Sequence, residues 1–188
     1  LRGGTGIDTV DYGSATGGIT ADLGDGTVSG LGTDQIEGIE NLSGSDYNDT
    51  ITGDQANNVL SGEDGDDILS GGGGNDTING GDGVDTIQFL GSIGDYDTEL
   101  SGASVLVIDT NLADGNEGSD TGTNVEILQF LGSGHVVTGA SVVISPNNGT
   151  AANEIYLGSS GADTTDMGDG NDFIFGGRGN DILTAGAG

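Results

Sequence analysis

The sequence predicts an all-β fold in which short strands stack around a thin apolar core. Three observations lead to this prediction: a nine-residue repeat, a shortage of apolar side chains and a large excess of acidic ones. Only 32% of the 188 residues are hydrophobic and 4% are aromatic, whereas 41 are glycine and one is proline. This small volume of apolar side chains cannot build a thick globular core. Backbone pairing between strands therefore has to supply much of the stability of the fold.

The repeat is clearest over residues 44–88, which divide into the rows GSDYNDTIT, GDQANNVLS, GEDGDDILS, GGGGNDTIN and GGDGVDTIQ. Each row begins with glycine and has Asp or Asn at position six and Ile or Leu at position eight. Positions one to six have turn residues, because glycine tolerates positive φ and Asp and Asn accept local hydrogen bonds. Positions seven to nine form a short strand, and side chains alternate along a strand, so position eight alone faces inward.

Further rows extend the pattern to other parts of the chain. Residues 149–184 read GTAANEIYL, GSSGADTTD, MGDGNDFIF and GGRGNDILT, and the row GGTGIDTVD opens the sequence. Weaker rows, SGLGTDQIE and QIEGIENLS, lead into the central block. Strands stacked about 4.8 Å apart would pair their backbones and pile the position-eight side chains into an apolar ladder.

Charge narrows the set of partners. Thirty-one acidic residues and two basic ones, Arg2 and Arg178, give a formal net charge of −29, and such a chain repels itself unless cations neutralise it. The lack of lysine makes nucleic acid and anionic membranes poor partners, and the lack of cysteine excludes disulfides and thiolate metal sites. No segment approaches the roughly 20 apolar residues of a transmembrane helix, so we expect no direct membrane insertion. Carboxylate and carbonyl oxygens suit hard cations such as calcium.

The rows resemble the nonapeptide G-G-x-G-x-D-x-U-x of the RTX (repeats-in-toxin), or hemolysin-type, calcium-binding repeat proteins, where U is a large apolar residue. The resemblance implies a right-handed parallel β-roll (β-solenoid) in which two rows make one coil. It also implies several Ca²⁺ ions, about five to eight, each held between successive turns by position-six carboxylates and backbone carbonyls.

If two rows make one coil, turns eighteen residues apart lie above one another. Asp49, Asp67 and Asp85 would then share one edge, and Asn58 and Asp76 the other. In the second block, Asp163 would stack with Asp181, and Glu154 with Asp172. The neutral Asn58 predicts a weak or absent site in its row. The candidate metal-site residues, including glycines that shape the turns, are Asp8, Asp34, Asp49, Gly62, Asp64, Gly65, Asp67, Gly71, Gly73, Asp76, Gly80, Asp82, Asp85, Asp120, Glu154, Asp163, Asp169, Asp172, Gly176, Arg178 and Asp181.

The repeat frame divides the chain into four predicted segments. They are degenerate leading RTX coils at 1–43, a regular roll at 44–88, an irregular β insertion at 89–148 and a second roll at 149–188. Within the insertion, VEILQFLGS at 125–133 repeats VDTIQFLGS at 84–92, which predicts one strand–turn unit used twice. The loop GNEGSD at 115–120 places Asp120 in the ligand column.

No catalytic residues are predicted, because the single histidine, His135, has no supporting catalytic constellation. We therefore expect no enzyme activity but a calcium-binding structural module of a large secreted or surface-attached bacterial protein, such as an adhesin, S-layer or filament segment. The resemblance implies type I secretion and folding on calcium outside the cell. The alternatives are an accessory C-terminal domain of an exported lipase, protease or polysaccharide-acting enzyme, or a glycan- or ice-binding module. Both ends stop in mid-coil, which predicts end-to-end self-association or a longer array.

Overall fold

The computed structural model describes residues 1–30, 32–101, 104–111, 117–132, 135–138, 155–157, 162, 164–166, 168, 173–176 and 179–184. These residues form β-strands and turns, with a single-turn 3-10 helix, η1 (Ile93–Asp95). No described helix has the length and apolar character that crossing a bilayer requires. The predicted all-β class is confirmed.

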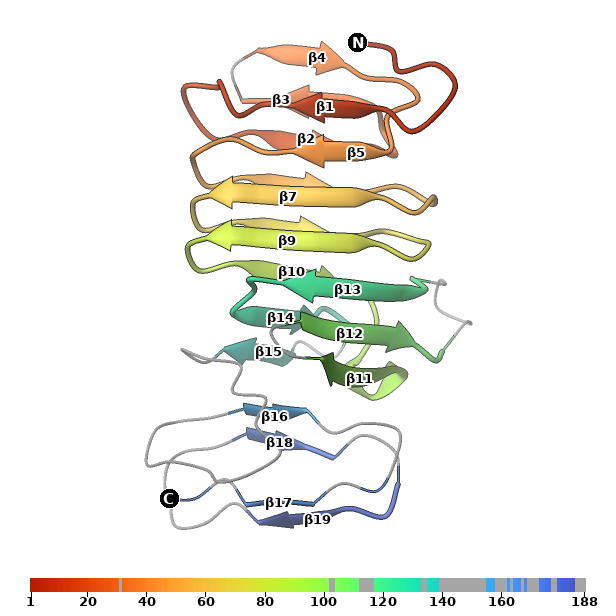
Figure 1. The fold of residues 1–188 in the computed structure, drawn as a ribbon, viewed down its shortest axis with the longest axis vertical. Helices are drawn as coiled ribbons and strands as arrows, with labels where there is room; N and C mark the ends of the chain where they lie inside the picture. The colour runs from red at the N-terminus through yellow and green to blue at the C-terminus, as the bar shows by residue number, and fades with distance from the viewer. Residues whose placement is uncertain are drawn as a thin grey trace.

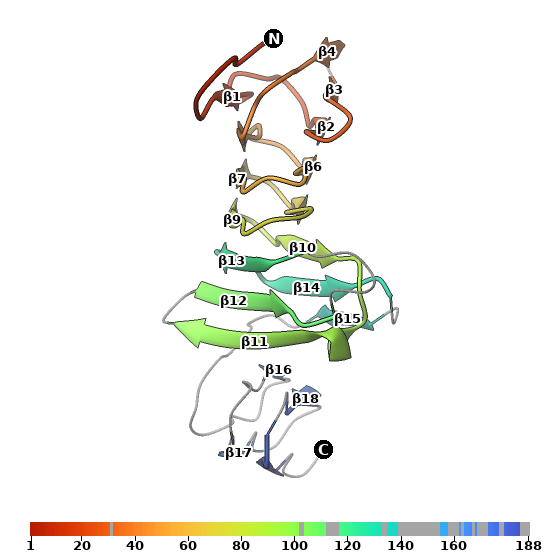
Figure 2. The ribbon, with the colours of Figure 1, turned by 90° about the vertical axis from the view of Figure 1, so that its right-hand side faces the viewer.

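Two sheets face each other across one apolar core, and the chain alternates between them as it winds down the roll (Figures 1 and 2). The first sheet contains, in spatial order, β1 (Thr9–Asp11), β5 (Asn41–Ser43), β7 (Val59–Asp64), β9 (Thr77–Asp82), β13 (Ser119–Thr123), β12 (Ser104–Asp109) and β11 (Tyr96–Ser101). The second contains β15 (His135–Thr138), β14 (Ile127–Phe130), β10 (Thr86–Phe89), β8 (Ile68–Ser70), β6 (Thr50–Thr52), β2 (Thr20–Asp22), β3 (Thr27–Ser29) and β4 (Thr33–Gln35).

The regular coils have the predicted register. In the first sheet Leu42, Leu60 and Ile78 align across parallel strands β5, β7 and β9. In the second sheet β6, β8 and β10 are also parallel, and they align three further position-eight side chains, Ile51, Leu69 and Ile87. None of these six side chains is more than 1% exposed. The thin apolar ladder and the two-row coil of a parallel β-roll are therefore confirmed.

The N-terminal part departs from the parallel coil. Strands β2, β3 and β4 pair antiparallel as a meander, so the row SGLGTDQIE does not form a parallel coil. Only three residues separate β3 from β4, and Gly30 and Gly32 have φ of 130° and 137°, which suits a tight reversal. A parallel connection would need a much longer crossover.

This meander corrects the expectation for Asp34. The residue lies in the middle of edge strand β4 with its side chain exposed, not in a turn. Its Oδ2 accepts a hydrogen bond from the Tyr12 hydroxyl at 3.0 Å. Asp34 therefore stands apart from the stacked turns.

The insertion extends both sheets and adds an aromatic core. Strands β11, β12 and β13 pair antiparallel, and β13 returns parallel to β9. Strands β10 and β14, which belong to the two copies of the QFLGS sequence, pair in parallel and align Phe89 with Phe130. The ring centroids of these two residues are 5.4 Å apart, and Tyr96 lies within 5.3 Å of both.

The second block shows the same spacing where it is described. Strand β16 (Ile155–Leu157) pairs parallel with β18 (Phe173–Phe175), and β17 (Thr164–Asp166) pairs parallel with β19 (Ile182–Thr184). Each pair joins residues one coil apart, as in the regular block.

Candidate metal centre

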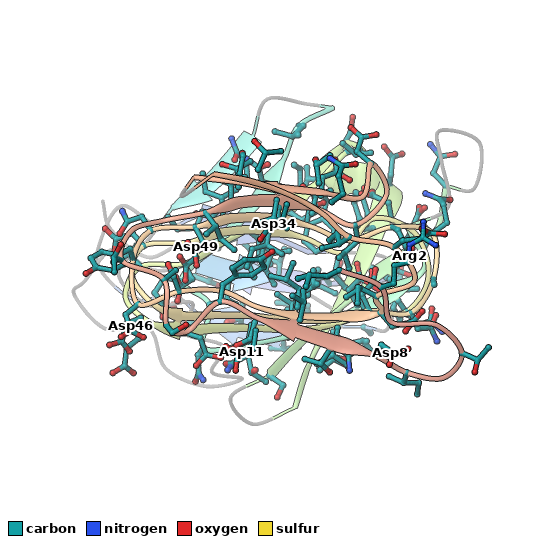
Figure 3. The ribbon with its side chains drawn as sticks, turned by 90° about the horizontal axis from the view of Figure 1, so that it is seen from above. Arg2, Asp8, Asp11, Asp34, Asp46 and Asp49 are labelled. Carbon is teal, nitrogen blue, oxygen red and sulfur yellow. The ribbon has the colours of Figure 1, made fainter. Side chains whose placement is uncertain are left out.

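The turns at each edge of the roll bring the position-six side chains into a column. On one edge the Asp49 amide donates to Asp67 Oδ1 at 2.7 Å, and the Asp67 amide donates to Asp85 Oδ1 at 2.9 Å. On the other edge the Asn58 amide donates to Asp76 Oδ1 at 2.8 Å. Figure 3 looks down the roll and shows Asp49 and Asp8 near opposite edges. The predicted assignment of these residues to two edges is confirmed.

The second column continues into the insertion. The Asp76 amide donates to Asp120 Oδ1 at 2.9 Å, although the two residues are 44 positions apart in the sequence. Asp120 therefore stands in the column position that the GNEGSD loop predicted for it.

These carboxyl groups are buried. Asp67, Asp76, Asp85 and Asp120 are all 3% exposed or less. Burial, which disfavours the ionised form, raises the pKa of Asp67 and Asp76 to about 6 and that of Asp120 to about 8, and it also raises the pKa of Asp85. Such turns favour either a proton or a cation that compensates the charge.

One oxygen of several carboxylates has no partner. Among the described residues, the buried side-chain oxygens without a hydrogen bond are Oδ2 of Asp8, Asp67, Asp76 and Asp85. A buried unpartnered carboxylate oxygen is costly, so native structures normally supply it with a donor or a cation. Each of these oxygens is therefore a candidate ligand for a metal ion.

In two other turns of these columns, the position-six side chain already accepts hydrogen bonds from its own turn. Asp49 Oδ2 accepts from the Ser45 amide at 2.5 Å, and Asp49 Oδ1 accepts from the Ser45 hydroxyl at 2.8 Å. Asn58 Oδ1 accepts from the Asp54 amide at 2.8 Å. The turns are thus of two kinds, although their sequences follow one pattern. In the first kind, that of Asp49 and Asn58, the position-six side chain accepts from its own turn. In the second kind, that of Asp67 and Asp76, Oδ2 has no hydrogen-bond partner.

The first glycine of several rows is needed because a position-six carboxylate oxygen lies where a Cβ would be. A Cβ placed on Gly62 would lie 2.1 Å from Asp67 Oδ2 and 2.5 Å from the Gly80 carbonyl oxygen. A Cβ on Gly71 would lie 2.1 Å from Asp76 Oδ2, and one on Gly176 would lie 2.7 Å from an oxygen of Asp181. A carboxylate oxygen thus packs closely against the glycine, and in the Gly62 turn a carbonyl oxygen lies close to the same position, so two acceptor oxygens converge there.

This donor set fits a hard cation. Within the described residues no three His, Cys, Asp or Glu side chains gather as a metal-binding group, so each site would combine a single carboxylate with backbone carbonyls. Carboxylate and carbonyl oxygens are the ligands that Ca²⁺ prefers. Asp67, Asp76 and Asp85, with the carbonyls of the next turn, are the residues that would hold it.

Stacked acidic turns, each beside a glycine, on a parallel β-roll define a class of cation-binding repeat protein. The family model of the RTX calcium-binding nonapeptide repeat matches this chain in four copies, over residues 36–69, 52–87 and 168–188. The chain therefore contains RTX nonapeptide repeats within these residues, and such repeats bind calcium in general.

A solved structure is also similar. It is the extracellular lipase LipA from Serratia marcescens, with 21% identity and a TM-score of 0.43 over 78% of this chain. The chain spans 28% of the length of that lipase.

The remaining predicted residues fall into three groups. Asp64 and Asp82 are exposed and pair with each other at the ends of β7 and β9. Gly65 has a φ of 129°, and the Gly73 amide donates to the Asp54 carbonyl at 2.6 Å, so both shape turns. The predictions for Glu154, Asp163, Asp169, Asp172 and Arg178 lie outside the described residues.

The candidate site residues left out two glutamates that belong to the columns: Glu40, which is position six of the weak row QIEGIENLS, and Glu126. The Asp85 amide donates to Glu126 Oε2 at 2.8 Å, and the Asp8 amide donates to Glu40 Oε2 at 2.9 Å. A signal for Glu126 was present, because the sequence copies at 84–92 and 125–133 align it with Asp85.

A second ladder at position five was also missed. The Asp66 amide donates to Asn48 Oδ1 at 3.0 Å, and the Asn75 amide donates to Asn57 Oδ1 at 2.8 Å. Position five is Asn or Asp in four of the five regular rows, which was the available signal. This ladder joins coils through protein groups alone.

Proposed function

We propose that this chain is a calcium-dependent structural module of a large secreted or surface-attached bacterial protein. The observation that carries the proposal is the unpartnered, buried Oδ2 of Asp67 and of Asp76, each packed against a glycine at which any side chain would clash with it. RTX repeats are typical of type I secreted extracellular proteins, which supports an extracellular location.

The balance between charge and core explains why folding would depend on calcium. Each regular row between residues 44 and 88 buries a single Ile or Leu, whereas the net charge of −29 opposes compaction. Bound Ca²⁺ supplies two positive charges and a partner for the carboxylate oxygen. Because a preformed site is absent from the unfolded chain, the binding free energy becomes folding free energy.

We propose a structural role for this module, not a catalytic one. The chain would remain unfolded at the low calcium concentration of the cytosol and form a rigid roll at the higher concentration outside, as an adhesin, S-layer or filament segment requires. We propose 1–43, 44–88, 89–148 and 149–188 as its segments.

A calcium titration tests this function. The far-UV circular dichroism of the purified chain should change from a coil-like spectrum in EGTA to a β spectrum in millimolar CaCl₂, and the change should reverse with EGTA. Magnesium chloride at the same ionic strength serves as a control for screening. A β spectrum that EGTA leaves unchanged would falsify the proposal.

A further inference from the structure

Asn79 and Gly80 form an Asn–Gly pair inside strand β9. Such a pair is chemically labile in a flexible chain, because glycine has no side chain that keeps its backbone nitrogen away from the asparagine amide. The chain has one other Asn–Gly pair, at 148–149, which lies outside the described residues. Whether the pair at 79–80 reacts therefore depends on how the fold holds it.

The reaction of this pair is deamidation. The backbone nitrogen of Gly80 attacks Cγ of Asn79, the Cγ–Nδ2 bond breaks, and the nitrogen leaves as ammonia with the proton that Gly80 has lost. Water then opens the resulting five-membered succinimide at one of its two carbonyls. Opening at one carbonyl gives aspartate, and opening at the other gives isoaspartate, in which the backbone runs through the former side chain. The reaction consumes water and requires no oxidant or cofactor.

The side chain of Asn79 is held in place by the neighbouring strands. Strand β9 lies inside the first sheet, between β7 and β13 (Figure 1). The side-chain Oδ1 accepts hydrogen bonds from Asn124 Nδ2 at 2.8 Å and from Thr123 Oγ1 at 3.3 Å, and Nδ2 donates to Ser61 Oγ at 3.5 Å. The side-chain amide therefore turns toward the backbone only when these bonds break.

The backbone at Gly80 is also constrained. Gly80 is buried, and a Cβ placed on it would lie 2.0 Å from the Asn124 carbonyl oxygen and 2.5 Å from Asp85 Oδ2. Neighbouring groups thus pack directly against this part of the backbone. Because attack on Asn79 requires the Gly80 nitrogen to move, the reaction requires β9 to open locally.

The two products differ in their effect on the coil. Aspartate at residue 79 keeps an oxygen for the Thr123 hydroxyl and the Asn124 amide, and position nine faces outward, where water solvates the new charge. Isoaspartate adds a carbon atom to the backbone before Gly80 and displaces this glycine from its closely packed position. Isoaspartate is therefore the product that disrupts the row.

We propose that Asn79 is a modification site whose deamidation records the time that the chain spends without calcium. In the folded roll the pair at 79–80 is protected. In the unfolded chain it deamidates, and the fraction that becomes isoaspartate no longer forms its coil. This inference rests on the proposed function, because it requires a chain that unfolds when calcium is absent.

The test incubates the full chain at mildly alkaline pH, with one sample in EGTA and another in CaCl₂. Peptide mass spectrometry measures the deamidated fraction at Asn79, and electron-transfer fragmentation distinguishes aspartate from isoaspartate. In EGTA the pairs at 79–80 and 148–149 should deamidate at similar rates. In calcium the rate at Asn79 should fall at least about tenfold, because the strand then has to open before the reaction.

Two variants separate the chemical lability from the structure. Asn79→Ser introduces at position nine the residue that Ser61 and Ser70 supply in their own rows, so it should fold in calcium even after incubation in EGTA. Asn79→Asp has the aspartate product from the start and should also fold. Wild-type chain returned from EGTA to calcium should lose circular dichroism signal in proportion to its isoaspartate content.

The outcomes separate this inference from the proposed function. If circular dichroism shows folding on calcium but Asn79 deamidates equally fast with and without it, the protection is overturned and the proposed function stands. If chains with isoaspartate fold in calcium as well as unmodified chains do, the effect on the coil is overturned. If the chain has the same β spectrum in EGTA and in calcium, the proposed function fails, and the link between deamidation and calcium fails with it.

Discussion

The turns at 44–49 and 62–67 follow one sequence pattern and stack in one column, yet they treat their carboxylates differently. In the first, the position-two residue Ser45 donates its amide to Asp49 Oδ2. In the second, the position-two residue Glu63 lies in the extended strand β7, paired with Gly81, and Asp67 Oδ2 has no donor. The comparison teaches that the hydrogen bonds within a turn, and not the repeat pattern, decide where a cation is needed; strand extension removes the donor of Asp67, whereas Asp76 lacks a donor after the short strand β8. The number of ions should therefore be smaller than the number of rows.

The largest expected effect is a pH dependence of the metal-free stability, to which the buried carboxyls of Asp67 and Asp76 contribute. Burial raises the pKa of Asp67 and Asp76 from 3.8 to about 6, so the folded carboxyls keep protons that the unfolded chain has released. Acid therefore stabilises the metal-free roll, and its stability falls as the pH rises through about 6, by roughly 3 kcal/mol for each group. Asp120, with a pKa raised to about 8, extends the fall to that pH.

Urea unfolding in EGTA between pH 4 and pH 8 measures this effect. In saturating calcium the trend should reverse below pH 6, because protons then compete with the ion. The variant with both Asp67→Asn and Asp76→Asn should lose the part of the dependence between about pH 4 and pH 6 that these two groups contribute, and keep the part due to Asp85 and Asp120. Metal-free stability that is constant, or that rises with pH, would contradict the assignment of these buried carboxyls.

A smaller effect is expected from single aspartate substitutions in calcium. Asp67→Asn and Asp76→Asn should each remove one ion, because asparagine keeps an acceptor for the neighbouring amide but loses the charge. The lost stabilisation is about 2.7 kcal/mol per site when calcium is at a hundred times its Kd. Isothermal titration calorimetry gives the stoichiometry, and thermal unfolding gives the loss of stability.

Asp49→Asn is the matched control for that experiment. Asp49 and Asp76 are both 2% exposed, so the substitution is the same in chemistry and in burial. Because Ser45 already donates to Asp49, we predict no change in the number of ions. If Asp49→Asn loses an ion as Asp76→Asn does, the distinction between the two kinds of turn is wrong.

The smallest expected effect concerns the position-five ladder. Asn75→Ala removes the acceptor of the Ser119 amide, a bond of 3.0 Å, and should cost about 1 kcal/mol without loss of calcium. Asp66→Asn keeps an acceptor for the Val84 amide and should change stability by less than about 0.5 kcal/mol. Chemical denaturation in calcium measures both variants. A lost ion in Asn75→Ala would show that this ladder contributes to the metal sites.

Sequence periodicity could predict the regular roll because each row has one inward apolar position. With one Ile or Leu in each regular row as the candidate for the core, the stacking register and the two aspartate columns followed. The antiparallel meander could not be predicted, since Thr33–Gln35 fits a row as well as a hairpin strand and the short connection decides between them.

The details of the site depended on tertiary structure. Glu126 enters its column 41 residues after Asp85, a separation that a fixed period of nine does not detect. Likewise, the position-two amide reaches Asp49 but not Asp67, and the length of β7 accounts for the difference. Residue type therefore predicted the columns, while hydrogen bonding distinguishes their members.

The most direct measurement is a crystal structure of the chain grown in CaCl₂, with calcium located by its anomalous scattering. We predict ions against Oδ2 of Asp67 and Asp76, and none against Oδ2 of Asp49 or Oδ1 of Asn58. An intact roll with no ion at Asp67 and Asp76, or with equal occupancy in all four turns, would contradict the dependence of calcium binding on unpartnered carboxylate oxygens.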